Sequence, residues 1–182
     1  MELTTGRPKS NDGRPEIEVR TYDFLDKTGI AYHTLSHSEV EAYTMETCAT
    51  LESTLGAQIV KTLFLGNRQQ TDFYLLIMPG DKPFKTKFLS SQLGCARLSF
   101  ADEEHMVSML GMHPGSASPL GLFNDVEHKI RMVIDKDLME RDTLGFVPCA
   151  DTASVRMPRT DFTDKFLPAT GHDYTVVELA VE

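Results

Sequence analysis

The chain has 182 residues, of which 41% are hydrophobic and 25% are charged, so it is long enough to form one globular domain with a substantial core. Its formal net charge of -9 argues against broad, sequence-independent nucleic-acid binding, which requires a strongly basic surface. Apolar runs such as Phe73–Met78 are too short to cross a bilayer, and the polar residues 1–14 are unlike a signal peptide or a membrane anchor. We therefore expect a cytoplasmic protein with no membrane partner, in which residues 1–14 form a flexible lead-in and residues 15–182 a single domain.

The first half of the chain predicts helices and strands in an irregular order. Residues 15–27 carry an apolar helical stripe that ends before Gly29, and a strand at 30–35 and a helix at 44–55 follow. Strands at 59–65 and 72–78 are separated by a short polar segment typical of a β-hairpin. A helix at 86–93, a strand at 97–100 and a helix at 101–110 complete this half.

The second half begins with a loop rich in glycine and proline. Strands are expected at 130–134, 144–147, 153–157 and 174–179, and a helix at 160–170. Strands interleaved irregularly with helices indicate an α/β fold with a mixed sheet, and the regular alternation of a doubly wound fold is absent.

Lys61 interrupts an otherwise apolar strand. With a period of two, Ile59, Lys61 and Leu63 share one face of the strand. The lysine either extends from an edge strand to water or places a cation at the floor of a pocket. The pattern alone leaves both interpretations open.

The loop from His113 to Leu122 contains two glycines and two prolines. Glycine permits close approach of a ligand to the backbone, and proline stiffens the chain. Successive N–H groups at Gly115, Ser116, Ala117 and Ser118 are therefore candidates for an oxyanion hole. The alternative is a purely structural turn between a helix and a strand.

Two groups of basic residues stand out in this acidic chain. The first comprises Lys82, Lys85 and Lys87 with Arg97 nearby, and the second contains Arg156, Arg159 and Lys165. Each group is either a local site for a nucleic-acid phosphate or a solvated face.

Other chemistries have little support in the sequence. His33 and His37 have the spacing of a metal pair, but no third ligand has the expected context. Cys48, Cys95 and Cys149 are odd in number and widely spaced, which favours a reducing compartment over a disulfide framework. No serine lies in a nucleophile-elbow pattern.

Three motifs, taken together, resemble one known family. They are Lys61-Thr62-Leu63-Phe64, the string from Gly111 to Asp125 that contains Gly115-Ser116-Ala117-Ser118-Pro119, and the tail Phe166-Leu167 with Gly171-His172. In their order and separation they are similar to the YbaK/prolyl-tRNA synthetase editing-domain family, especially its free-standing alanyl-tRNA(Pro) deacylases. The resemblance covers nearly the whole chain from about Glu16 onward.

The resemblance implies a single α/β domain with a central curved mixed sheet flanked by helices. It also implies hydrolysis of the ester between a mischarged amino acid and the 3′-terminal adenosine of tRNA, with prolyl-tRNA synthetase as a candidate partner. Lys61 would orient the terminal phosphate or the ester carbonyl, and the backbone from Gly115 to Pro119 would hold the developing oxyanion. Water would be the nucleophile, and neither a metal nor a cofactor is implied.

The remaining site residues also follow from this resemblance. The substrate site is expected to include Phe64, His113, Gly121, Val147 and Asp151. The acidic balance of the chain suggests few tRNA contacts, confined to the acceptor end near Lys82, Lys85 and Lys87. Val147 replaces a histidine that many of these deacylases carry, and Asp151 stands where asparagine is usual. Alanine remains the first candidate for the amino acid, with cysteine, serine or another small residue behind it. A non-catalytic sensor of aminoacyl-tRNA or of an amino acid that regulates proline metabolism is a third possibility.

Overall fold

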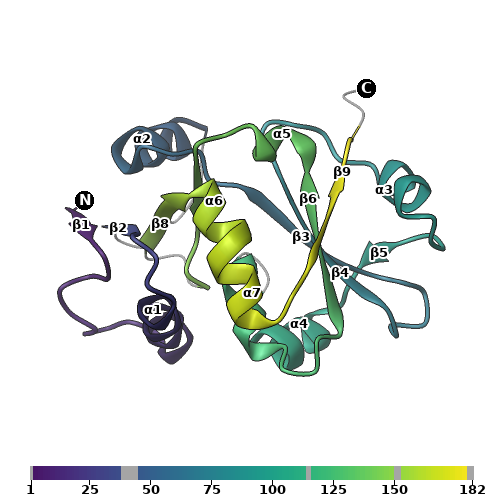
Figure 1. The fold of residues 1–182 in the computed structure, drawn as a ribbon, viewed down its shortest axis with the longest axis horizontal. Helices are drawn as coiled ribbons and strands as arrows, with labels where there is room; N and C mark the ends of the chain where they lie inside the picture. The colour runs from purple at the N-terminus through teal and green to yellow at the C-terminus, as the bar shows by residue number, and fades with distance from the viewer. Residues whose placement is uncertain (1, 38–44, 114–115, 150–152, 180–182) are drawn as a thin grey trace.

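The computed structural model describes residues 2–37, 45–113, 116–149 and 153–179. Its strands form two sheets, and helices pack around both of them (Figure 1). The expected α/β class is therefore confirmed, but the single central sheet is replaced by two sheets that meet at one junction.

The smaller sheet is antiparallel throughout and has the order β1-β2-β8-β7. Its strands are β1 (Glu2–Thr5), β2 (His33–Ser36), β7 (Thr143–Phe146) and β8 (Ala153–Pro158). Residues 1–14 were expected to form a flexible lead-in, but within this segment Glu2–Thr5 form β1, which pairs with β2 along four residue pairs. The polar, threonine-containing sequence of β1 gave no apolar alternation from which a strand could be recognised.

The larger sheet is mixed and has the order β5-β3-β4-β6-β9. Its strands are β3 (Lys61–Gly66), β4 (Phe73–Met78), β5 (Ser99–Phe100), β6 (Ile130–Asp135) and β9 (Tyr174–Val177). The predicted hairpin of β3 and β4 is confirmed, and β4, β6 and β9 run parallel to one another.

The two sheets meet where the chain enters β3. The amide of Val60 donates to the carbonyl of Gly145 at 2.9 Å, and the amide of Gly145 donates to the carbonyl of Gln58 at 3.0 Å. This reciprocal pair of hydrogen bonds connects β7 of the smaller sheet to the segment immediately before Lys61.

Eight helical segments lie in the described part of the chain besides a single turn at residues 136–139. Five of them are separate helices, namely α1 (Glu16–Thr28), α2 (Met45–Leu55), α3 (Thr86–Leu93), α4 (Glu103–Leu110) and the 3-10 helix η1 (Pro119–Asn124). The other three follow one another without a break, namely α6 (Arg159–Asp161), η2 (Phe162–Phe166) and α7 (Leu167–Thr170). The single turn is α5 (Lys136–Met139). Helix α1 ends at Gly29, which has the left-handed conformation that glycine adopts without strain. None of the described helices is long and apolar enough to cross a membrane.

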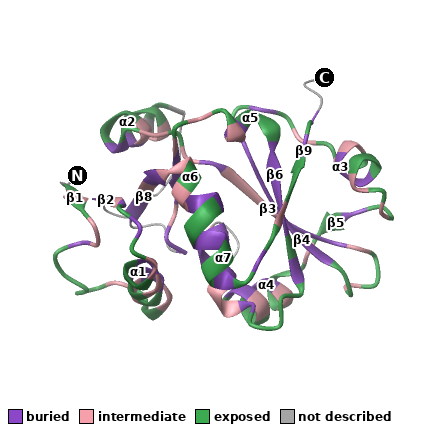
Figure 2. Cartoon of the chain, in the orientation of Figure 1, coloured by how far each residue is buried: buried purple, intermediate pink, exposed green. Residues whose placement is uncertain are grey.

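The larger sheet separates two apolar clusters, because side chains alternate along each strand. On β4, Leu75 and Ile77 belong to the first cluster, which also contains Phe64 and the residues Leu120 and Leu122 of η1. Leu76 and Met78 point the other way into the second cluster, which includes Leu89 of α3. Figure 2 shows β4 and β6 as the buried centre of the sheet. The two faces of β3 therefore present their side chains to different environments.

Candidate functional site

Lys61 is the first residue of β3 and is half-buried. It shares a face of the strand with Leu63 and Leu65, which pack in or against the second cluster. Its Nζ donates a hydrogen bond to the main-chain carbonyl of Lys82 at 2.8 Å. An ammonium group has three N–H donors, and no other described acceptor bonds this one, so two donors remain for a ligand.

A groove of about 940 Å³ opens beside Lys61. It is lined by four cations, three apolar side chains and two hydroxyl groups, namely Lys61, Leu63, Phe84, Lys85, Thr86, Lys87, Ser90, Arg97 and Phe100. Among the described residues that line the groove none is acidic, although the whole chain has a net charge of -9. Positive charge is thus concentrated at one place on an acidic protein, an arrangement suited to a phosphate-bearing ligand.

Aromatic rings accompany these cations. Phe100 leaves 62% of its surface exposed in a short edge strand, an unusual exposure for so large an apolar side chain. Phe88 lies on α3, and the Nζ atoms of Lys85, the residue just before this helix, and of Lys87 lie 5.8 and 5.1 Å from its ring centroid, which is cation–π range. Phe84 and Phe100 line the groove and offer faces on which a base can stack, and the Lys85 and Lys87 side chains line it with them.

Lys82 does not belong to this exposed group. Its side chain is only 6% exposed, and its Nζ lies 2.9 Å from Asp135 Oδ2 and 3.1 Å from Asp137 Oδ2. Burial alone would lower the pKa of Lys82, but hydrogen bonds and Coulombic attraction from the two carboxylates outweigh it and raise the pKa. The side chain predicted to contact tRNA is therefore already paired inside the protein, whereas Lys85 remains exposed at the groove.

In the loop before η1, described amide groups predicted to face a ligand already donate hydrogen bonds within the protein. The Ser118 hydroxyl caps η1 by accepting a hydrogen bond from the Leu120 amide at 3.2 Å, and the Ser118 amide donates to Met112 Sδ at 3.2 Å. The Ser116 amide donates to the His113 carbonyl at 3.1 Å. Of the amides predicted to converge here, only that of Ala117 has no hydrogen-bond acceptor among the described residues, and Gly115 lies outside them.

The loop and the groove lie against opposite faces of β3. Ala117 packs on the first cluster, to which Phe64 contributes a side chain that is 2% exposed, while Lys61 points to the other face. Within the described residues nothing from 116–122 lines the groove. The structure therefore does not bring the Lys61 ammonium and this loop into direct contact, and it places Phe64 in the core.

The loop does adjoin another predicted part of the substrate site. Gly121 is buried, and a Cβ there would meet the Cε of Met112 and lie 3.3 Å from Cys149 Sγ. Gly121 thus lies directly against Cys149, two residues after Val147, and the Val147 side chain is half-buried. His113 is exposed, with its Nδ1 3.7 Å from Glu103 Oε1, and Pro119 is buried at the start of η1. Asp151 lies outside the described residues.

A scan against protein-family descriptions matches residues 39–165 to the aminoacyl-tRNA editing domain. This match covers well over half of the chain. The chain belongs to the aminoacyl-tRNA editing domain family.

Individual relatives of this editing domain agree with the assignment. The prolyl-tRNA editing protein ProX of Acetoanaerobium sticklandii is 30% identical over 155 residues, which cover 85% of this chain and 93% of that protein. The prolyl-tRNA synthetase associated domain-containing protein 1 of Mus musculus is 30% identical over 164 residues, with coverage of 88% and 92%. A solved structure described as a candidate trans-editing enzyme for prolyl-tRNA synthetase has a TM-score of 0.65 at 17% identity, with coverage of 91% and 99%, and shows that the fold is shared.

Sequence reasoning missed several features of this editing domain. The exposed ring of Phe100 and the hydroxyl groups of Thr86 and Ser90 line the groove, but no local pattern marks them. The pairing of Lys82 with Asp135 was also missed, because the two residues are 53 positions apart. In the described parts of the chain no cluster of His, Cys, Asp and Glu is suited to a metal ion, and His37 bonds Ser154 through its Nε2.

Proposed function

We propose that this editing domain is a trans-editing hydrolase that removes alanine from mischarged Ala-tRNA(Pro). The observation that carries the proposal is the position of Lys61 at the head of a basic, partly aromatic groove in a chain of the aminoacyl-tRNA editing domain family. The names of the relatives, a prolyl-tRNA editing protein and a prolyl-tRNA synthetase associated domain, support a tRNA(Pro) substrate and prolyl-tRNA synthetase as a partner. Such an enzyme would act in the cytoplasm, where aminoacyl-tRNA is formed.

The groove binds the single-stranded acceptor end in this proposal. Lys85, Lys87 and Arg97 neutralise its phosphates, and Phe84 and Phe100 offer stacking surfaces for its unpaired bases. Because the protein is acidic overall, repulsion limits contact with the rest of the tRNA, so binding is confined to this end.

Lys61 then acts on the reacting ester. Its two unbonded donors reach the terminal phosphate or the ester carbonyl, where a positive charge stabilises the oxygen as it becomes an oxyanion. Water attacks the carbonyl carbon, the bond to the ribose oxygen breaks, and this oxygen receives a proton, so that free amino acid and tRNA are released. The ribose hydroxyl or the amine of the substrate assists in removing the proton from water.

The Ala117 amide is the donor that the loop offers to the oxyanion. The loop and the groove lie on opposite faces of β3, and Lys61 is the first residue of this strand. One substrate can therefore contact both only if it extends around the Lys61 end of β3. The amino acid would then lie near Val147, whose modest size suits a small side chain such as that of alanine.

The test is hydrolysis of purified Ala-tRNA(Pro), Cys-tRNA(Pro) and Pro-tRNA(Pro) by the wild type, by Lys61→Ala and by Lys27→Ala. Lys27 is an exposed lysine in the last turn of α1 and serves as the matched control. We expect the wild type and Lys27→Ala to clear the alanyl ester and to spare the prolyl ester. Lys61→Ala should lose about 10²–10³-fold in rate, as removal of an oxyanion donor does.

Two other outcomes would change the assignment. Preferential cleavage of the cysteinyl ester would keep the hydrolase and change its amino acid. If no ester is cleaved faster than its spontaneous decay, the protein is not a deacylase, and a sensor of aminoacyl-tRNA becomes the leading function.

A further inference from the structure

We propose that the buried ion pair between Lys82 and Asp135 is a positioning device that holds the Lys61 ammonium in its working place. This inference rests on the proposed function, since it concerns the same lysine. It assigns a role in catalysis to two residues that are far from Lys61 in the sequence and do not touch the substrate.

The contacts form a continuous chain from β6 to Lys61. Asp135, the last residue of β6, is fully buried and holds Lys82 Nζ at 2.9 Å. The Lys82 carbonyl in turn accepts the hydrogen bond from Lys61 Nζ at 2.8 Å. The ion pair thus fixes the side chain of Lys82, and the main-chain carbonyl of the same residue accepts the hydrogen bond from Lys61.

Within the turn that carries Lys82, its side chain is the buried one. This turn follows β4, and in it the Lys82 amide donates to the Pro79 carbonyl at 3.2 Å, while Asp81 and Pro83 on either side are exposed. Without the buried Lys82 side chain, this turn would be held only at its two ends, by β4 on one side and by Phe84, which packs against the second cluster, on the other. The carbonyl that orients Lys61 would then be free to move.

Asp135 itself is held firmly. Its Oδ1 accepts the amide of Asp137 at 3.0 Å and caps α5, while its Oδ2 faces Lys82. Both oxygens of the carboxylate are therefore used, one for each neighbouring segment. Asp137 also contacts Lys82 but leaves 56% of its side chain exposed, so water competes with it.

The energetics favour a geometric role over a stabilising one. A buried ion pair gains little net stability compared with apolar packing, because desolvation offsets the attraction between the charges. A fixed donor position, in contrast, matters strongly to a reaction, since a misplacement of about 1 Å costs on the order of 10²-fold in rate.

Steady-state hydrolysis of Ala-tRNA(Pro) tests the proposal with Asp135→Asn and the matched control Asp137→Asn. The first substitution keeps an oxygen for the α5 cap but turns an amide group toward the Lys82 ammonium, so the pair is broken. We expect Asp135→Asn to lower kcat by about 10- to 100-fold with KM changed less than about twofold, because Lys85, Lys87 and Arg97 still bind the substrate. Asp137→Asn should stay within about threefold of the wild type.

A second variant keeps the proposal testable if Asp135→Asn does not fold. The double variant Lys82→Met/Asp135→Leu removes both charges together and fills the space with apolar groups, which proteins usually tolerate. It should fold, as judged by circular dichroism and thermal melting, and show the same loss of kcat. The conservative variant Lys82→Arg, which retains a cation for Asp135, should keep most of the activity.

The outcomes separate this inference from the function on which it rests. Wild-type kcat in the folded double variant, or a loss that appears only in KM, would show that the pair does not position Lys61. If the wild type does not cleave the ester, or Lys61→Ala is fully active, the proposed function fails first and the positioning role fails with it.

Discussion

At the scale of single residues, neighbouring lysines in the sequence have opposite roles in the structure. Lys82 and Lys85 are three positions apart, yet Lys82 is buried against Asp135 whereas Lys85 lies exposed at the groove. Burial of one lysine depends on a carboxylate at the end of a distant strand, so no local pattern could separate the two. Lys61, in contrast, was recognisable because its polarity interrupts an apolar strand face.

Buried weak acids also set a limit on the pH range in which the protein is stable. Burial raises the pKa of the Cys149 thiol to about 12, and burial together with a hydrogen bond to Glu18 raises the pKa of Tyr22. The native protein therefore keeps these protons to a higher pH than the unfolded chain, in which a thiol titrates near pH ~8.5. The free energy of unfolding must then fall as the pH rises above about 8.5, and this contribution is fully present below it.

We predict that Cys149→Ala reduces the alkaline loss of stability. Between pH ~8.5 and ~10 the Cys149 thiol contributes a slope of up to about 1.4 kcal/mol per pH unit, because the unfolded thiol has lost its proton there and the native one has not. Urea unfolding at several pH values should show a shallower decline for Cys149→Ala than for the wild type or for Cys48→Ala, whose thiol is half-buried on α2. Equal slopes in all three proteins would show that the Cys149 proton is not linked to folding.

At the scale of elements, the junction between the two sheets positions the start of β3. Gly145 exchanges two main-chain hydrogen bonds with the segment before Lys61, and this approach leaves no space for a side chain. A Cβ on Gly145 would lie 2.9 Å from the Gln58 carbonyl oxygen and 3.2 Å from the Ile59 Cα, both backbone atoms that cannot rotate away.

We predict that Gly145→Ala destabilises the protein by roughly 1–3 kcal/mol, the usual cost of forcing extra atoms into a packed region. For a chain of this length the melting temperature should fall by roughly 2–4 °C per kcal/mol. Gly80→Ala is the matched control, because a Cβ there would lie 3.5 Å from the Ile59 carbonyl oxygen, an ordinary contact. Equal melting temperatures for the two variants would contradict the tight junction.

The same junction shows what the sequence could and could not predict about the elements. The hairpin of β3 and β4 and the helices that end at Gly29, Gly94 and Gly111 follow from local periodicity and glycine positions, and the structure confirms them. Division of the strands into two sheets depends on pairing between distant segments, such as β2 with β8. Local patterns carry no information on such partners, so one sheet was expected where there are two.

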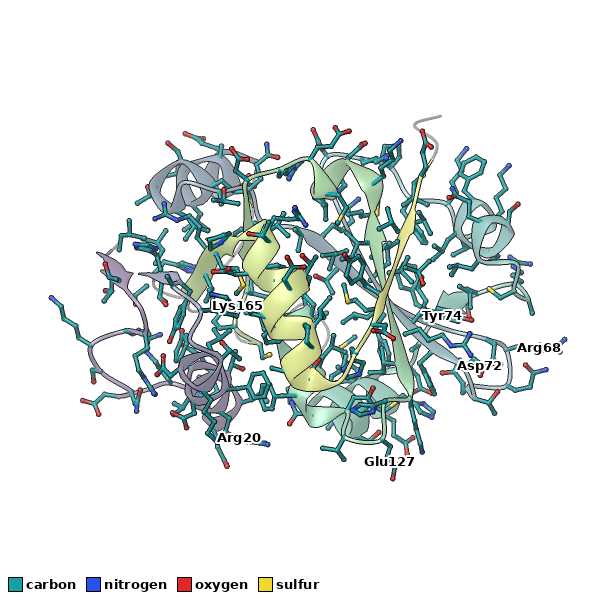
Figure 3. The ribbon with its side chains drawn as sticks, viewed as in Figure 1. Arg20, Arg68, Asp72, Tyr74, Glu127 and Lys165 are labelled. Atoms are coloured by element: carbon teal, nitrogen blue, oxygen red, sulfur yellow. The ribbon has the colours of Figure 1, made fainter. Side chains whose placement is uncertain are left out.

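At the scale of the whole molecule, the position of the basic residues, and not the net charge, determines where a phosphate-bearing ligand can bind. The second basic cluster expected from the sequence is largely engaged within the protein, since Arg156 donates to the Leu55 carbonyl and Arg159 to the Thr163 hydroxyl. Figure 3 shows Lys165 on the helical segment η2, away from α3. Its Nζ lies 3.7 Å from Asp161 Oδ1. The groove is therefore the basic surface best placed to bind phosphates.

We predict that the salt dependence of the affinity for tRNA arises from the basic residues of the groove alone. Each of Lys85→Ala, Lys87→Ala and Arg97→Ala should weaken the affinity for tRNA(Pro) and reduce the slope of log K against log salt concentration by about 0.7, the value for one phosphate contact on a single strand. Lys165→Ala removes the same charge from an exposed side chain of η2 and should leave the slope unchanged. Fluorescence anisotropy with labelled tRNA(Pro) between about 50 and 200 mM salt measures both quantities. If Lys165→Ala reduces the slope as much as the groove variants do, the tRNA lies across another face of the molecule, and the exposed rings of the groove then need a different ligand.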